Sequence, residues 1–152
     1  MKKHKFKIVL FIVIIALVYA VYYNFFRYNE ATVTINDYVF KTEVVQSEKD
    51  VTRGLSGREI LADNQAMFFI LPEKKIYRFW MKDMKFNIDL LWIDDNKIVG
   101  FEKNMQAFEN ITSANDLPAY SSPQAVDRVL EIKAGLIDSL DIKIGDIINI
   151  SI

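Results

Sequence analysis

The sequence predicts a mainly β domain with short helices, of the α+β class, folded as a compact antiparallel-rich β-barrel or half-barrel behind one transmembrane helix. Short β-branched and aromatic runs recur along the chain between turn-forming residues, which is typical of small β domains. Only brief stretches show helical spacing. The first thirty of the 152 residues also differ sharply in composition from the rest, which leaves about 120 residues for one ordinary domain.

The N-terminal segment has the composition of a membrane anchor. Residues 8–26 are apolar or aromatic except for Asn24, and about 20 such residues span a bilayer. Residues 1–7 form a basic tail, which predicts a cytoplasmic N-terminus. We therefore expect a single-pass plasma-membrane protein with residues 27–152 outside the cell. A cleaved signal peptide is the alternative, but bulky aromatic residues stand where a cleavage site needs small ones.

Composition excludes several function classes. The chain has 19 basic and 20 acidic residues, and five of the basic ones lie in residues 1–29, which contain no acid; residues 30–152 therefore carry a net charge of −6. Such a charge is a poor match for nucleic acid. The chain has no cysteine, and its only histidine is His4. Thiol chemistry, disulfides, cysteine or histidine zinc sites and histidine bases are thus excluded from the globular part.

The first half of that part predicts a hairpin and a helix. Residues 31–35 and 38–45 are β-rich runs separated by Asn36 and Asp37, which is the chemistry of a two-residue hairpin turn. Ser47 followed by Asp50 resembles a capping box, so we expect a helix over residues 48–56 that ends at Gly57. Gly54 within it indicates an early helix end, close packing or the approach of a ligand.

The remaining elements are short. We expect strands over 67–71, 76–81, 88–93, 98–101, 129–134 and 146–152, with a helical turn over 136–140 and a surface loop over 104–118. Pro72 should end the first of these strands. Asp94, Asp95 and Asn96 form a polar turn that lacks the glycine and glutamate of a calcium loop, and neither a metal nor a cofactor is expected.

The segment 140–146 is similar to the Gly-Asp box of cradle-loop barrels. In that motif the glycine, here Gly145, makes the turn, and the aspartate, here Asp146, holds the loop through hydrogen bonds. This similarity favours a cradle-loop-barrel-like domain.

Six ordered patches also resemble one family, the uncharacterised domain of unknown function 192. The patches are residues 53–58, 67–69 before Pro72, 79–82 with Asp89 downstream, Tyr120-Ser121 before Pro123, 129–131 before Ala134-Gly135, and Gly145-Asp146. The resemblance covers about residues 39–152. It implies a compact β-rich domain of an exported or membrane-tethered prokaryotic protein and leaves the biochemical function open.

Two groups of charged residues are candidates for a site. Arg53 and Arg58 flank a glycine-containing turn, where they would clamp a carboxylate or phosphate while Gly54 allows close approach. The alternative is a structural salt bridge to Asp89 or Glu131. Lys82 and Asp89 lie in apolar surroundings and need partners. They predict either an internal pair, with each other or between Asp89 and an arginine, or a polar ligand-binding cluster.

Aromatic and hydroxyl side chains complete the candidate set. Trp80 and Trp92 are expected in the core, but an exposed Trp80 would offer a stacking face to a sugar. Tyr120 and Ser121 lie in a loop bounded by prolines, where their hydroxyls would orient a ligand.

The sequence favours a noncatalytic binding or accessory module of the cell envelope for a small anionic or sugar-like ligand or a partner. The candidate binding residues are Arg53, Gly54, Arg58, Trp80, Lys82, Asp89, Tyr120 and Ser121. One alternative is an envelope hydrolase or transferase that uses Asp89 as base and Lys82 for charge stabilisation. A purely structural assembly partner is another, and it would require a large exposed apolar patch.

Overall fold

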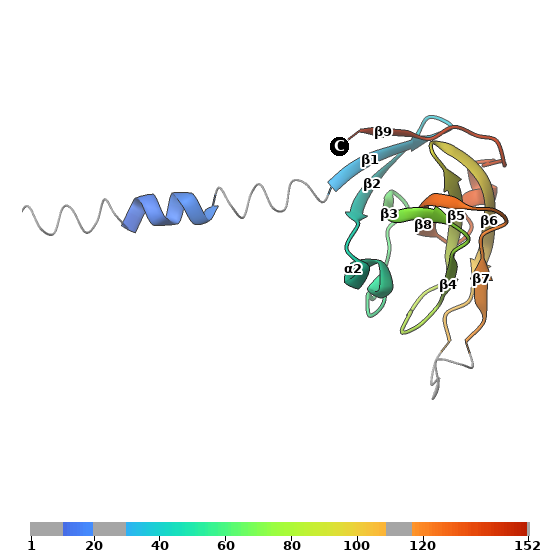
Figure 1. Cartoon of the computed structure of the whole chain (residues 1–152), viewed down its shortest axis with the longest axis horizontal. Coiled ribbons are helices and arrows are strands. Elements are labelled where there is room, and N and C mark those ends of the chain that lie inside the picture. The colour runs from blue at the N-terminus through green and yellow to red at the C-terminus, as the bar shows by residue number, and fades with distance from the viewer. Residues whose placement is uncertain (1–10, 20–29, 109–116, 152) are drawn as a thin grey trace, which may run out of the picture.

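The computed structural model describes residues 11–19, 30–108 and 117–151, and the last two ranges contain nine strands and two short helices (Figure 1). In chain order these elements are β1 (Glu30–Ile35), β2 (Tyr38–Val45), α2 (Glu48–Arg53), β3 (Gln65–Lys75), β4 (Arg78–Trp80), β5 (Ile88–Asp94), β6 (Lys97–Met105), β7 (Ala119–Ser121), β8 (Val126–Lys133), α3 (Leu136–Ser139) and β9 (Asn149–Ser151). The prediction of a mainly β domain with short helices is confirmed.

Seven of the strands form one mixed sheet in the order β6-β5-β8-β3-β2-β1-β9. Its neighbours pair antiparallel except β2 and β3, which run parallel, and α2 lies in the connection between them. A parallel pair needs such a crossover. Strands β4 and β7 pair with each other in a separate two-stranded ribbon.

The sheet is curved but not closed, so the predicted barrel is wrong. Strands β6 and β9 stand at its two edges, and among the described residues the backbone hydrogen bonds between the two ends join residues 145–148 to residues 96–98. Strand β9 has three residues and pairs with β1. It is too short to pair along the nine residues of β6, and closure needs a complete ladder between the end strands.

The turn residues of the first hairpin adopt the conformation that their chemistry predicts. Ile35 lies opposite Tyr38, and the turn residues Asn36 and Asp37 have φ values of 48° and 65°. These positive angles match the type I′ turn that fits the twist of a hairpin. The predicted hairpin is confirmed.

Two boundaries differ from prediction. The helix α2 ends at Arg53 because Gly54 has φ 50° and ψ −135°, a conformation open to glycine that breaks the helix before residue 56. Strand β3 passes through Pro72 because its register to β8 is irregular between Ile70 and Lys75. Proline lacks an N–H and is tolerated where the ladder is interrupted.

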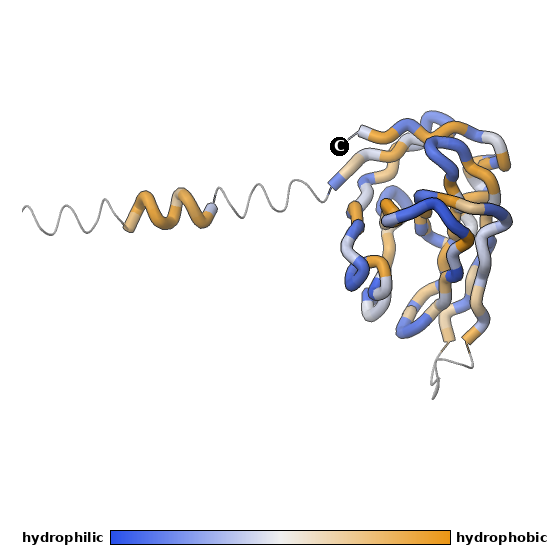
Figure 2. Tube along the Cα trace, viewed as in Figure 1, coloured by the Kyte–Doolittle hydropathy of each residue, from blue (hydrophilic) through white to orange (hydrophobic). Residues whose placement is uncertain are grey.

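The sheet separates two apolar clusters, because successive side chains of a strand point to opposite faces. One face buries Phe68, Leu91 and Leu130 against β1 and β2. The other buries Phe69, Trp92 and other residues, and α2, β4 and the loops next to them cover it. Figure 2 shows the apolar residues running along the strands that enclose these clusters. Trp92 is fully buried, as predicted.

Asp89 is buried among these apolar residues, with 1% of its surface exposed. Its Oδ1 accepts the backbone N–H of Asn104 at 2.8 Å, and its Oδ2 accepts those of Gly135 at 3.0 Å and Ile137 at 2.9 Å. The predicted pairing of Asp89 with Lys82 or an arginine is therefore wrong. Backbone amides supply the partners that a buried carboxylate needs.

The Gly-Asp segment has the predicted local geometry. Gly145 has φ 104°, and Asp146 Oδ2 accepts the Lys143 N–H at 2.8 Å and the Asn36 side-chain amide at 3.1 Å. The aspartate thus ties its own loop to the first hairpin turn.

Residues 11–19 of the N-terminal segment are helical and hydrophobic along nearly their whole length (Figure 2). Among the described residues, none of the helices has both the length and the apolar character to cross a bilayer. The other residues of the expected span, 8–10 and 20–26, lie outside the described part of the chain.

Replacing Asp89 should destabilise the fold strongly. The substitution Asp89→Ala leaves three backbone N–H groups without their acceptor, and hydrogen bonds to a charged group contribute about 1.5–3 kcal/mol each. We expect chemical denaturation to show a free energy of unfolding lower by about 3 kcal/mol or more. The control Asp63→Ala removes an exposed acid that pairs with Lys133 and should cost about 1 kcal/mol or less. Equal effects of the two substitutions would contradict this role for Asp89.

Candidate functional site

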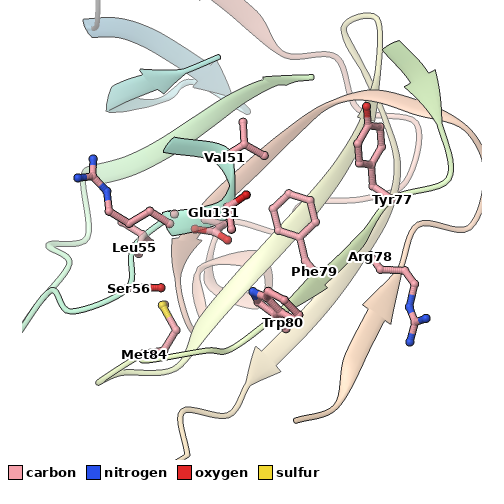
Figure 3. Close-up of a pocket in the computed structure, with 12 residues that line it drawn as sticks. Val51, Leu55, Ser56, Tyr77, Arg78, Phe79, Trp80, Met84 and Glu131 are labelled. Atoms are coloured by element: carbon pink, nitrogen blue, oxygen red, sulfur yellow. The ribbon is translucent and has the colours of Figure 1, made fainter. Parts of the chain in front are cut away.

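A pocket of about 160 Å³ opens between the end of α2 and strand β4 (Figure 3). Its volume is many times the roughly 10–15 Å³ that one water molecule requires. The residues that line it come from α2 and the loop after it, from β4 and its neighbours, and from β8: Val51, Thr52, Arg53, Gly54, Leu55, Ser56, Tyr77, Arg78, Phe79, Trp80, Met84 and Glu131.

The loop after α2 forms one wall. It is fixed to the segment after β4 by two hydrogen bonds: the Ser56 hydroxyl donates to the Lys82 carbonyl at 2.7 Å, and the Gly57 N–H donates to the Asp83 carbonyl at 2.8 Å. Because Gly54 turns the chain sharply, the apolar side chain of Leu55 is buried beside the pocket.

Aromatic side chains form the opposite wall. The Phe79 ring makes edge contacts with Phe69 and Trp92, with ring centroids 5.3 Å and 5.5 Å apart. These contacts hold Phe79 in place. Trp80 follows it with 46% of its surface exposed, so the prediction of Trp80 as a core residue is wrong. It lies on the peripheral β4–β7 ribbon, where it reaches both the pocket and solvent.

Glu131 lies at the floor of the pocket, between the two walls (Figure 3). On strand β8 it stands opposite Met67 on one side and Leu90 on the other, and only 6% of its surface is exposed. Its Oε2 is buried and has no hydrogen-bond partner among the described residues. A Cβ at Gly54 would lie 3.7 Å from this oxygen, so the glycine backbone packs directly beside the carboxyl group.

Burial raises the pKa of Glu131 from 4.5 to about 8, and the charge of Arg58 opposes the rise. Removal from water disfavours the charged form of a carboxyl group. Glu131 is therefore mostly protonated at neutral pH, and a protonated carboxyl group both donates and accepts hydrogen bonds.

The nearby arginines do not form ion pairs with Glu131. Arg53 pairs with Asp50 at 3.1 Å, and Arg58 pairs with Glu43. In Figure 3 the Arg78 side chain extends away from Glu131. The predicted salt bridge from these arginines to Asp89 or Glu131 is wrong, because Arg53 and Arg58 pair with other acids, Asp50 and Glu43.

Three of the eight sequence-predicted site residues line the pocket: Arg53, Gly54 and Trp80. Arg58 lies near enough to influence Glu131. The exposed Lys82 side chain is not part of the lining, although its backbone carbonyl anchors the wall.

The other predicted residues lie elsewhere. Asp89 is held by backbone amides, which counts against its use as a general base, since its oxygens are engaged. Tyr120 and Ser121 are on β7, opposite Phe79 and Arg78 of β4, and they do not line the pocket. The structure therefore does not gather the eight predicted residues into one site.

Sequence reasoning named Glu131 only as a partner for an arginine. The available signal was an acid in the middle of an apolar strand, the same signal that selected Asp89. No cluster of three or more histidines, cysteines or acids that would hold a metal occurs within residues 11–19, 30–108 and 117–151.

Comparison with known proteins identifies an uncharacterised family. The model of family DUF192, described as "Uncharacterized ACR, COG1430", matches residues 31–150. No curated protein matches the chain.

Two crystal structures share the fold. One is a protein of unknown function from Novosphingobium aromaticivorans, with a TM-score of 0.69 and 25% identity over 79% of this chain and 83% of the other. The second is described as a "putative transcription regulator" from Sinorhizobium meliloti, with a TM-score of 0.67 and 22% identity over 79% of this chain and 91% of the other. The second likeness supports the fold alone.

The buried acid should make stability depend on pH. The pKa of Glu131 is about 8 in the folded state and 4.5 as its ordinary value, so the folded state binds more protons between these limits. Stability should therefore fall as pH rises from about 5 to 8, by up to about 1.4 kcal/mol per pH unit from this group.

The substitution Glu131→Gln should remove that dependence, because an amide does not titrate. Denaturation of the wild type and the variant at pH 5 and pH 8 measures the difference. The matched control Glu102→Gln, on the partly buried β6 position opposite Leu90, should keep the wild-type slope. Parallel curves for the wild type and Glu131→Gln would show that Glu131 is not protonated in the folded state.

Proposed function

This chain belongs to the DUF192 family, and from that premise we propose that it is a membrane-tethered, noncatalytic binding module of the cell envelope, with its ligand site at the Glu131 pocket. The ligand is a small anionic or sugar-like molecule, free or carried by an envelope partner. One observation carries the proposal: the buried Glu131 carboxyl group, whose Oε2 has no partner in the described part of the chain, lies at the floor of an open pocket.

An unpaired buried polar group is costly, at about 1–3 kcal/mol. Native proteins satisfy nearly all such groups, and the exceptions call for a reason. The lining combines apolar and aromatic side chains with polar ones, and among the described residues Glu131 is its only acidic side chain. A preformed pocket with apolar walls and a few polar groups is the usual form of a small-molecule site. A bound ligand would supply the missing hydrogen-bond partner.

The pocket supports binding better than catalysis. Hydrolysis of envelope sugars by acid–base chemistry generally uses two carboxyl groups, whereas Glu131 supplies the one carboxyl group among the described residues that line this pocket. Asp89, the base of the alternative enzyme hypothesis, accepts three backbone N–H groups. Neither it nor Lys82 lines the cavity.

The tether consists of residues 8–26, with the basic tail 1–7 in the cytoplasm and residues 27–152 outside. Support comes from the apolar composition of the segment, from the basic residues before it and from the helical conformation of residues 11–19. In this arrangement the domain stays attached to the outer face of the plasma membrane of the cell that makes it.

The ligand site is tested by removing its aromatic wall. Trp80→Ala deletes an exposed stacking face, so any compound that raises the melting temperature of the wild-type chain through the pocket should bind at least tenfold more weakly to the variant. A panel of envelope sugars, phosphates and carboxylates, followed by calorimetric titration of each compound that raises the melting temperature, measures this loss.

The matched control is Phe108→Ala, which removes an aromatic side chain that is 40% exposed and lies outside the pocket lining. This variant should bind each such compound with the affinity of the wild type. If both substitutions lower the affinity equally, or if Trp80→Ala leaves the affinity of every compound unchanged, the binding site lies elsewhere.

The tether is tested by fractionation. The full-length chain should stay in the membrane fraction after an alkaline carbonate wash, because about 20 apolar residues hold a helix in the bilayer. The double substitution Ile14→Lys and Leu17→Lys places two charges in that segment, each costing about 2.5–3.5 kcal/mol at a helix centre, and should reduce retention. Release of the wild-type chain by the wash would contradict the anchor.

A further inference from the structure

We propose that the pocket selects an uncharged, hydroxyl-bearing ring such as a sugar or cyclic polyol, with the Glu131 carboxyl group hydrogen-bonded to a ligand hydroxyl and Trp80 against a C–H face of the ring. The inference rests on the proposed function of the pocket as a binding site, and it chooses between the two ligand classes considered there.

The positive charges around the pocket are already engaged or directed elsewhere. Arg53 pairs with Asp50 and Arg58 with Glu43, and the Arg78 side chain extends away from the floor (Figure 3). An anion at the floor would therefore meet the Glu131 carboxyl group with no guanidinium directed at the floor to clamp it. Anion sites in proteins normally present such a fork or several backbone amides.

A cation is also disfavoured. To pair with one, Glu131 would have to ionise, and burial holds its pKa near 8. Arg53 and Arg78 line the walls, and Arg58 acts on Glu131 from nearby. Arg53 and Arg58 are paired with acids, but Arg78 forms no salt bridge with the described acids, and its charge repels another positive charge that enters the pocket.

An uncharged ring with hydroxyl groups fits both parts of the pocket. Glu131 can donate to one hydroxyl and accept from another, and these bonds would give partners to a carboxyl group whose Oε2 has none among the described residues. Leu55, Phe79, Trp80 and Met84 present apolar and aromatic surface above it. The face of an aromatic ring packs against apolar surface. The C–H face of a sugar ring is such a surface.

Ligands that share one ring and differ only in charge test this directly. We would compare glucose, glucuronate and glucosamine, and the corresponding galactose and mannose series, on the full-length chain in detergent micelles at pH 6. Saturation-transfer NMR detects weak binding, and calorimetric titration gives the affinities. In at least one series the neutral sugar should bind at least tenfold more tightly than both charged forms. A charged member that binds best overturns the inference.

Substitutions at the floor test the contact. Glu131→Gln keeps a neutral group that donates and accepts, so the affinity for the neutral sugar should stay within about threefold. Glu131→Leu has a similar volume and no polar atoms, and it should lose at least tenfold. The control Glu102→Gln should bind as the wild type does. If Glu131→Leu binds the neutral sugar with wild-type affinity, the carboxyl group does not contact the sugar and the inference fails.

The outcomes separate this inference from the proposed function. If every sugar fails but another compound binds in a manner that depends on Trp80, the pocket is a binding site and its ligand class is different. If no compound shows a dependence on Trp80 or Glu131, the proposed function and this inference both fail.

Discussion

The fold depends on the three backbone hydrogen bonds that the buried Asp89 carboxylate accepts. They connect β5 to the end of its neighbour β6 at Asn104 and to the chain entering α3 at Gly135 and Ile137. One side chain thus fixes the turn that follows β8, from which the chain continues to β9. Because β5 also pairs with β8, the same contact sets where β8 ends and so where Glu131 stands along it.

Two buried acids on neighbouring strands have opposite consequences. Asp89 is surrounded by amide N–H groups, which is the condition under which a carboxylate is stable in an apolar interior. Glu131 stands between Met67 and Leu90, has an oxygen with no partner within residues 11–19, 30–108 and 117–151, and has a raised pKa. Hydrogen bonding in one case, and its absence in the other, decides which acid supports the scaffold and which faces a cavity.

Local sequence signals predicted local structure well. Three features depend mainly on residues within a few positions of one another: the Asn36-Asp37 turn, the cap at Ser47 and the loop held by Asp146. A long-range contact between two of them joins Asn36 to Asp146. The parallel pairing of β2 with β3 and the open sheet depend on contacts between distant segments. Glu131 was recognisable as a buried acid, but its lack of a partner depends on where Arg53 and Arg58 find theirs, and no sequence spacing contains that information.

The energetic cost of burying Glu131 favours a functional role for the pocket. A leucine at this position would lie between Met67 and Leu90, and replacing buried ionisable groups with apolar ones of similar volume is often neutral or stabilising. The chain instead carries an acid whose burial costs stability as pH rises, next to a glycine whose backbone conformation, with φ 50° and ψ −135°, turns the chain beside the carboxyl group. Departures from the most stable choice concentrate at sites that bind or react. The pocket floor meets that description, whereas Asp89, equally buried but fully bonded, does not.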